Sequence, residues 1–340
     1  MSDPDGLILG LETSCDDTCA AVVSGTGALR SNVISSQGIH DAYGGVVPEI
    51  ASRHHLELVN AAVDDALRRA GATLDDIDRV AVTQGPGLVG ALLVGVSTAK
   101  AIAAARGLAL VPVDHLQGHV AANFLRVDAS AEAIMEPPFL CLLASGGHTL
   151  LARVAGHETF TVLGSTLDDA AGEAFDKGAR LLGLPFPGGP ALERAARDGD
   201  PQAFAFPVAR GVSGLDFSFA GVKTALLYRV RELGERQALS RRADLAAAYQ
   251  HAIVTALVER CEQALARDGG DRLAVGGGVA ANGPLCDRLS ALGVTLGVPP
   301  RELCTDNAAM IASAGRFAAA QPFPAYLAID AYASGERALS

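Results

Sequence analysis

The sequence predicts a duplicated α/β fold, in which two related halves each combine a strand hairpin with later strands and helices. Residues 78–82 (D-R-V-A-V) are echoed by residues 271–275 (D-R-L-A-V), and a glycine-rich turn follows each segment. Val-Pro pairs also begin at Val111 and Val298. Echoes of this kind indicate that one structural unit occurs twice in the chain.

The first half begins with a strand hairpin whose turn is polar. An apolar run over residues 7–11 is followed by T-S-C-D-D-T and by a second apolar run over residues 19–23. Apolar residues at helical spacing then predict a helix that ends at Gly71. His54 and His55 near its start are adjacent in sequence, which favours a solvated helix start over a pair of ligands. A strand over residues 78–82, a helix to residue 105 and a strand over residues 108–113 complete this half.

The second half starts as the first one does, with strands over residues 139–143 and 150–154 around the turn A-S-G-G-H-T. Its two glycines and two hydroxyls make this turn the better phosphate cradle of the two hairpins. Residues 166–169 (T-L-D-D) look like the N-cap of a helix that carries Asp176. Asp176 fits either a contact with sugar hydroxyls or a solvated helix face. An amphipathic helix over residues 245–265 precedes the strand at residues 271–275.

Two histidines four residues apart, His115 and His119 in H-L-Q-G-H, are the strongest candidate for a metal site. Side chains four apart on a helix share a face, so both imidazoles can reach one ion. His119 stands eight residues after Val111, and Asp306 stands eight residues after Val298. We therefore expect Asp306 to be the third ligand. The alternative is a hydrogen-bonded core pair, since this spacing alone is a weak pattern.

Composition bounds the function. The net charge of −11 argues against binding nucleic acid or membranes by overall charge, although a local basic patch stays open. Five arginines at positions 229, 231, 236, 241 and 242 form such a run, either facing RNA or simply solvated. Six cysteines without a C-x-x-C pair fit reduced thiols in a cytosolic protein. The acidic N-terminus is not a signal peptide, and residues 89–105 are expected to form a buried helix rather than a membrane span.

Two halves of this kind resemble the actin, Hsp70 and sugar-kinase (ASKHA) superfamily, which binds nucleotide between two lobes. The segments G-L-E-T-S-C-D-D-T, G-G-V-V-P-E-I-A-S-R-H-H, Q-G-P-G-L-V-G-A-L-L-V-G, H-L-Q-G-H, A-S-G-G-H-T, A-F-D-K-G-A-R-L-L-G-L, P-G-G-P and G-G-V-A-A-N are more specific. Together they resemble the bacterial TsaD family, the tRNA N6-adenosine threonylcarbamoyltransferases. The resemblance runs from Leu7 to about Ala314.

The resemblance implies transfer of a threonylcarbamoyl group from threonylcarbamoyl-adenylate to N6 of the adenosine 3′ of the anticodon, with release of AMP. It implies a divalent metal, iron(II) or alternatively zinc, held by His115, His119 and Asp306. The substrate-binding residues that it implies are Leu143, Ala144, Ser145, Gly146 and Gly147 for the acyl-phosphate region, and Asp176, Gly189 and Asn282 for the nucleotide. Asp16 matches a catalytic aspartate at the hairpin tip, whereas Asp17 stands where the family more often has glutamate.

The implied partners are tRNA, the TsaB and TsaE proteins and a TsaC-type synthase that supplies the adenylate, in the cytoplasm and away from membranes. The expected domains are an N-terminal lobe over residues 1–127, a linker over 128–138, a C-terminal lobe over 139–305 and a tail over 306–340 packing back on the first lobe. The rival interpretations are an ASKHA-type ATPase or sugar kinase, a metallopeptidase, and a non-catalytic scaffold. A peptidase of the H-E-x-x-H type has a glutamate where Leu116 stands.

Overall fold

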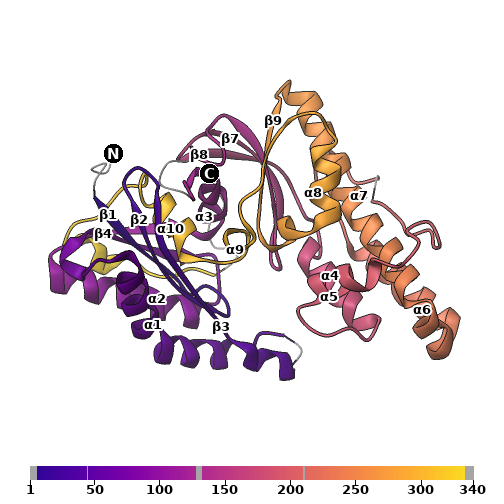
Figure 1. Ribbon diagram of the computed structural model, residues 1–340, viewed down its shortest axis with the longest axis horizontal. Coiled ribbons are helices and arrows are strands. Elements are labelled where there is room, and N and C mark those ends of the chain that lie inside the picture. The colour runs from indigo at the N-terminus through magenta and orange to yellow at the C-terminus, as the bar shows by residue number, and fades with distance from the viewer. Residues whose placement is uncertain (1–5, 44, 128–131, 210, 334–340) are drawn as a thin grey trace. The chain divides into compact units, whose positions relative to one another are not determined.

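The computed structural model describes residues 6–43, 45–127, 132–209 and 211–333. Its contacts divide the chain into two compact units (Figure 1). The first unit comprises residues 1–137, 155–160 and 302–340, and the second comprises residues 138–154 and 161–301. Part of the expected linker, residues 128–131, and the end of the tail lie outside the described residues. The domain boundaries given above therefore stay a prediction.

The two units contain five-stranded sheets with the same strand order. The first is β3-β2-β1-β4-β5 and the second, written from the same end, is β8-β7-β6-β9-β10. The central strand of each sheet, β1 or β6, is antiparallel to its hairpin partner, β2 or β7. It is parallel to the strand on its other side, β4 or β9. The expectation of a duplicated α/β fold is confirmed. The strands are β1 (Leu7–Glu12), β2 (Asp17–Ser24), β3 (Leu29–Ser36), β4 (Ile77–Gly85), β5 (Ala109–Asp114), β6 (Phe139–Ala144), β7 (Thr149–Gly156), β8 (Thr159–Ser165), β9 (Arg272–Gly276) and β10 (Thr295–Gly297).

Helices cover both faces of the first sheet. On β1, Leu9 and Leu11 join a buried cluster with residues of α1 and α2. Alternate residues of a strand point to opposite faces. Gly10 accordingly faces the other way, where a Cβ would lie 2.3 Å from the carbonyl oxygen of Ala308 in α10. The helices of this unit are η1 (Gly38–Tyr43), α1 (Pro48–Ala70), η2 (Leu74–Asp76), α2 (Val89–Arg106), α3 (His115–Ala121), η3 (Ala122–Phe124), α10 (Ala308–Ala314) and η5 (Ala325–Ala328).

Two expectations about the first unit's helices have different outcomes. α1 ends as predicted, because Gly71 takes the left-handed conformation with φ 66° that caps a helix. His55, however, is fully buried. Its Nε2 donates to the Cys15 carbonyl at 3.0 Å, and its Nδ1 accepts from Thr18 Oγ1 at 2.8 Å. The solvated reading of His55 is therefore wrong, because α1 packs against β2 at this point.

α2 is the one described helix with the length and composition to cross a membrane. In this structure it packs against α1 and β4 instead. Ala91, Leu92, Ala99 and Ala103 are fully buried in these contacts. The expectation of a core helix is consistent with this packing, since core helices pass the same test of length and composition.

The second unit places its long helices α6 and α7 beside the shorter α4 and α5. The predicted N-cap at residues 166–169 is wrong for α4, since that helix begins at Ala171 without a side-chain cap. Asp168 instead accepts hydrogen bonds from the backbone of Phe219 and Ala220 at the start of α6. The remaining helices are α4 (Ala171–Leu181), α5 (Gly188–Ala196), α6 (Ala220–Ser240), α7 (Arg242–Asp268), η4 (Gly278–Ala281), α8 (Gly283–Ser290) and α9 (Arg301–Cys304).

Candidate functional site

His115 and His119 lie on the short helix α3, directly after β5. Asp114 begins this helix, because its carboxylate accepts hydrogen bonds from the backbone N–H groups of Leu116 and Gln117 at 2.9 and 3.2 Å. The two imidazoles are buried, and their ring centroids lie 4.7 Å apart. The predicted shared face is therefore present.

Asp306 reaches the histidines because α10 packs closely against α3. The glycine between the histidines makes this approach possible, since a Cβ on Gly118 would lie 2.7 Å from Ile311 Cδ1. Asn307 caps α10 by accepting from the Met310 N–H at 2.9 Å, and it leaves Asp306 just before the helix. Asp306 Oδ1 lies 3.2 Å from His119 Nε2 and 3.6 Å from His115 Nε2.

These three residues form a group that can hold a metal ion. Their nearest ligand atoms all lie within 4.8 Å of one another. Two atoms bound to one metal at 2.0–2.2 Å stand roughly 3.0–3.4 Å apart, which is close to both observed separations. Moreover, both ring nitrogens of His119 are buried: Nδ1 has no hydrogen-bond partner among the described residues, and Nε2 faces the Asp306 carboxylate without a well-formed hydrogen bond. Buried polar atoms are normally satisfied, so the donor set fits a cation.

Sequence reasoning did not single out Glu12, which completes this centre. Glu12 ends β1 and is fully buried. Its Oε2 lies 3.0 Å from His115 Nδ1 and accepts from Thr83 Oγ1 at 2.5 Å, while Oε1 accepts from the Ser14 N–H. The sequence feature that could have identified Glu12 is its position as a charged residue at the end of the otherwise apolar strand L-I-L-G-L-E.

The carboxylates make the centre attractive to positive charge. Burial opposes a charged His115, but Asp306 and Glu12 outweigh it and raise the pKa of His115 to about 9. Burial likewise opposes the ionised form of Glu12, yet the charge of His115 and its hydrogen bond lower the pKa of Glu12. A proton or a metal ion can supply this positive charge, and the two compete for His115.

The hairpin tip between β1 and β2 carries Asp16 and Asp17. The backbone carbonyl of Asp16 accepts from the Gln37 N–H at 3.2 Å. The Asp16 side chain is half-buried and lies in the same hairpin as Glu12. Burial and the charges of Asp306 and Asp16 raise the pKa of Asp17 to about 7, although a hydrogen bond from Ser36 opposes the shift. The catalytic role of Asp16 stays a prediction.

In the second unit, the turn after β6 is closed on itself. The Ser145 N–H donates to the His148 carbonyl at 2.8 Å, and the His148 N–H donates to Ser145 Oγ at 3.1 Å. A Cβ on Gly146 or Gly147 would meet nothing within 4 Å. The glycines of this turn, which follows Leu143 and Ala144, thus border open space, as a phosphate cradle requires.

Asp176 and Gly189 meet at the start of α5. Asp176 Oδ1 accepts from the Gly188 N–H at 2.8 Å, and Gly189 contributes a second backbone hydrogen bond. Burial raises the pKa of Asp176 despite these bonds. The side chain is half-buried, and it satisfies N–H groups at a helix start. Neither earlier interpretation foresaw this contact, and the ribose role stays a prediction.

Asn282 is buried at the start of α8. Its side-chain oxygen accepts from the Leu285 N–H at 3.1 Å. Its amide nitrogen donates to Gln250 Oε1 at 3.0 Å and to Glu193 Oε2 at 3.2 Å. η4, which precedes Asn282, contacts both α4 and β6. The structure thus gathers the segments that carry the expected substrate residues.

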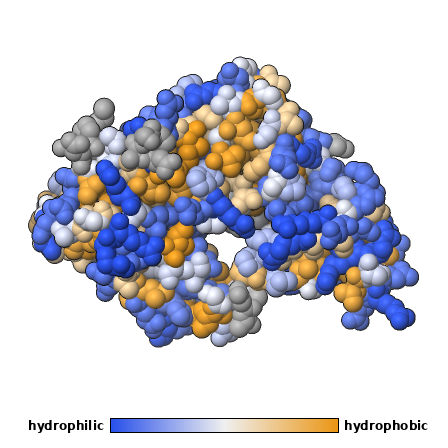
Figure 2. Space-filling view, in the orientation of Figure 1, coloured by the Kyte–Doolittle hydropathy of each residue, from blue (hydrophilic) through white to orange (hydrophobic). Residues whose placement is uncertain are grey.

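The basic run lies where α6 meets α7, and acidic residues partly neutralise it. Arg229 pairs with Glu232 at 2.8 Å, and Arg241 pairs with Asp244 at 2.7 Å. The outer end of α6, at the lower right of Figure 2, shows mostly hydrophilic side chains. An RNA contact here stays a prediction.

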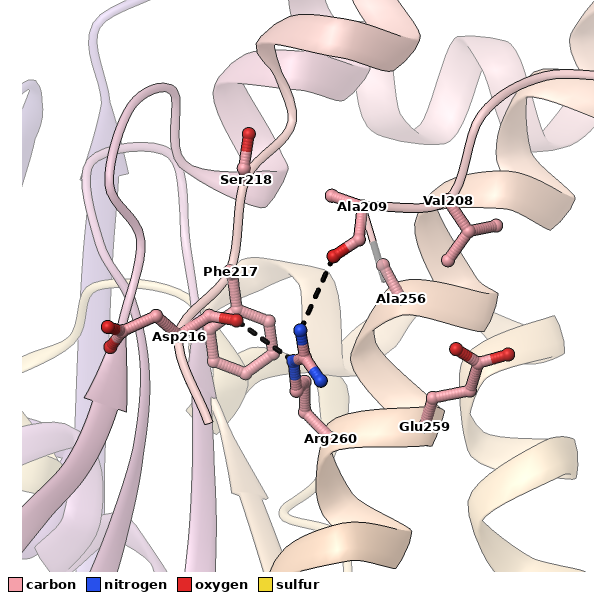
Figure 3. A pocket seen from close by; sticks show the side chains of 8 residues that line it. All are labelled: Val208, Ala209, Asp216, Phe217, Ser218, Ala256, Glu259 and Arg260. Atoms are coloured by element: carbon pink, nitrogen blue, oxygen red, sulfur yellow. Dashed lines mark hydrogen bonds between the residues drawn. The ribbon is translucent and has the colours of Figure 1, made fainter. Parts of the chain in front are cut away.

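A small hollow between α7 and the segment before α6 contains none of the predicted site residues. Figure 3 shows that Arg260 points into it from α7. The guanidinium donates to the carbonyls of Asp216, Val212 and Ala209 at 2.9, 3.0 and 3.3 Å. Because its donors are used on backbone oxygens, Arg260 serves to hold this segment rather than to bind a ligand.

Comparison with known proteins identifies the family. A model of the TsaD family, tRNA N6-adenosine threonylcarbamoyltransferase, matches residues 28–313. The chain belongs to the TsaD family. A relative of that name from Symbiobacterium thermophilum is 53% identical over 318 residues, which cover 92% of each chain. Relatives of the same name from Syntrophus aciditrophicus and Clostridium perfringens are 51% and 46% identical to this chain, over 91% and 92% of each chain.

Solved structures outside the TsaD family share the fold. Component A of (R)-2-hydroxyglutaryl-CoA dehydratase from Acidaminococcus fermentans superposes with a TM-score of 0.56 at 13% identity, over 92% of this chain and 98% of that one. HypF from T. kodakarensis gives a TM-score of 0.59 at 16% identity, over 92% of this chain and 47% of its own. Such neighbours confirm the ASKHA-like fold, but at this identity they carry no function across to a TsaD protein.

Proposed function

We propose that this protein transfers the threonylcarbamoyl group from threonylcarbamoyl-adenylate to N6 of the adenosine 3′ of the anticodon in tRNAs that read codons beginning with adenosine. A bond forms between N6 and the carbamoyl carbon, the bond from that carbon to the phosphate oxygen breaks, and AMP leaves while N6 loses a proton. Family membership carries this proposal. The group of two buried histidines and one half-buried aspartate supports it, because that donor set fits a metal-dependent acyl transfer.

His115, His119 and Asp306 would hold the metal, which we propose to be iron(II), with zinc as the alternative. A bound divalent ion would supply a Lewis acid for the substrate carbonyl, on which negative charge develops during attack. The chain contributes the position of the three ligands and a buried setting in which such an interaction is strong. A peptidase reaction has no support, because α3 carries no acidic residue between its histidines.

The residues of the second unit would hold the adenylate. Residues 143–147 offer an open glycine turn for the acyl-phosphate, while Asp176, Gly189 and Asn282 would face the nucleotide. Asp16 would act at the reacting group.

We further propose that TsaB and TsaE assist and that a TsaC-type synthase supplies the adenylate. The net charge of −11 supports a need for partners, since the chain attracts RNA poorly by charge. Free cysteines support a cytoplasmic location.

The deciding experiment combines the metal-loaded protein, threonylcarbamoyl-adenylate, unmodified tRNA, TsaB and TsaE. Mass spectrometry of the digested tRNA should find threonylcarbamoyladenosine, and AMP should appear in equal amount. His119→Ala should abolish the product because one ligand is lost. Phosphorylation of a sugar by ATP, or cleavage of a protein, in the absence of modified adenosine would reject the transferase in favour of the corresponding rival.

Binding of the adenylate is tested with Asp176→Asn. The asparagine oxygen can still accept from the Gly188 N–H, so the start of α5 keeps that hydrogen bond while the charge is removed. We expect calorimetry to show adenylate affinity about 10-fold lower, with metal content unchanged, since a charge-assisted hydrogen bond contributes about 1.5 kcal/mol or more. Unchanged affinity would leave Asp176 as a helix cap only.

A further inference from the structure

Glu12 contacts a proposed metal ligand on the side that faces away from the metal. Its carboxylate lies 3.0 Å from His115 Nδ1, whereas His115 Nε2 lies 3.6 Å from Asp306 on the opposite side of the ring. We propose that Glu12 is a positioning residue for the metal centre: it holds the proton on His115 Nδ1 and thereby keeps Nε2 free to bind the ion. This inference rests on the metal centre of the proposed function and adds a residue to it.

The hydrogen bonds around Glu12 fix which atoms donate. An ionised carboxylate only accepts hydrogen bonds. Its three neighbours are the Ser14 N–H, the Thr83 hydroxyl and His115 Nδ1. Nδ1 must therefore carry a proton, so that when the ring is neutral, as metal binding requires, its lone pair lies on Nε2. Metal-bound histidines commonly donate their other ring N–H to a carboxylate, which sets the tautomer and the ring orientation.

The two histidines of the centre differ in this respect. His115 is held through Glu12, with Ser14 Oγ also 3.2 Å from Nδ1. His119 has no such support, since its Nδ1 is buried and has no hydrogen-bond partner among the described residues. Glu12 itself is fixed at the end of β1 and pinned by Thr83 from β4. The sheet thus sets the orientation of His115 before any ion arrives.

Glu12→Gln tests this role, because an amide cannot replace the carboxylate. If the amide oxygen faces His115, the NH₂ group meets the Ser14 N–H, which is also a donor. If the NH₂ group faces His115, Nδ1 must accept and the ring proton moves to Nε2, where it blocks metal binding. Titration of the full-length chain with Zn²⁺ against a competing chelator should show affinity about 10- to 100-fold lower.

Asp114→Asn is the matched control. Asp114 also raises the pKa of His115 through its charge, but its carboxylate accepts hydrogen bonds from the backbone of α3 and from the Tyr332 hydroxyl, and not from the imidazole. Asparagine caps helices about as well as aspartate, so this variant removes a nearby charge and keeps the fold. Zn²⁺ affinity should change less than 3-fold. Equal losses in the two variants would mean that charge alone acts, and the positioning role would be rejected.

Thr83→Val provides a milder second variant, in case Glu12→Gln does not fold. Valine has nearly the shape of threonine but cannot donate to Glu12, so the carboxylate is less well fixed and zinc affinity should fall by a smaller factor. In the zinc-loaded wild type, NMR of ¹⁵N-labelled histidine should find the His115 proton on Nδ1. A proton on Nε2, or wild-type affinity in both variants, would overturn the inference. A wild-type chain that binds no Zn²⁺ would instead contradict the metal centre itself.

Discussion

At the scale of single residues, the raised pKa of Asp17 predicts how the stability of the folded chain depends on pH. Burial first, and then nearby acidic charges, raise its pKa in the folded chain to about 7, above the ordinary aspartate value of 3.8. The folded state therefore holds this proton more tightly than the unfolded state does. The resulting stability is complete below about pH 4 and is lost as the pH rises towards 7.

Asp17→Asn removes this dependence. In chelator-treated protein, the melting temperature of the variant relative to wild type should rise between pH 4.5 and pH 7.5 and then level off. Ser36→Ala should move the midpoint of the wild-type decline to higher pH, because the Ser36 hydrogen bond lowers the pKa of Asp17. Thermal unfolding followed by circular dichroism measures both effects. A difference that is constant with pH would refute the raised pKa.

Residues also mark where sequence reasoning stopped. The three metal-binding candidates could be predicted because two share a helix face and the third follows a repeated Val-Pro pair. Glu12 was missed because its partner His115 stands 103 positions away and no periodicity links them. His55 was misjudged for the same reason, since its burial depends on the packing of α1 against β2.

At the scale of elements, the contact between α3 and α10 predicts the effect of Gly118→Ala. A Cβ at position 118 would lie 2.7 Å from Ile311 Cδ1 and 3.3 Å from Met310 Cγ. Overpacking of this kind costs about 1–3 kcal/mol, while alanine recovers about 1 kcal/mol in helix propensity. We expect a net loss of about 1 kcal/mol in the free energy of unfolding. Metal affinity should also be weaker, because Asp306 lies just before α10 and moves with it.

Two further variants isolate the contact. Gly221→Ala in α6 adds the same methyl group where nothing lies within 4 Å, so it should stabilise the protein slightly. Ile311→Val removes the atom in the way, and in combination with Gly118→Ala it should restore metal affinity. Chemical denaturation and zinc titration of Gly118→Ala, Gly221→Ala, Ile311→Val and the Gly118→Ala/Ile311→Val double variant, each compared with wild type, test these expectations. Additive effects of Gly118→Ala and Ile311→Val would show that the helices do not clash at position 118.

Elements were predictable where the pattern was local. The hairpins, α1 with its glycine cap and the strands β4 and β9 followed from short-range patterns. The assignment of residues 166–169 failed because Asp168 caps α6, about 50 positions later, and not the helix that follows it directly. Capping residues are locally recognisable, but the helix that they cap is decided by tertiary packing.

At the scale of the whole molecule, the duplication was the most informative feature of the sequence. Two echoes of five or fewer residues indicated two related halves, and the structure gives these halves two sheets with one strand order. The fold could be predicted because each copy must bury a sheet in the same way. The arrangement of the expected substrate residues could not be predicted, since α4, α5, η4 and α8 meet through contacts such as Asp176 with Gly188 and Asn282 with Glu193.

The path of the chain through the first unit has a consequence for biosynthesis. His119 and Asp306 are separated by 187 positions, and residues 161–301 of the second unit lie between them. During translation, the N-terminal sheet and both histidines leave the ribosome long before Asp306 has been made. The nascent chain at that stage presents the β1 surface around Gly10 without α10 to cover it. The three proposed ligands can therefore come together only after the second unit has been synthesised, which would restrict complete metal loading to the last stage of production.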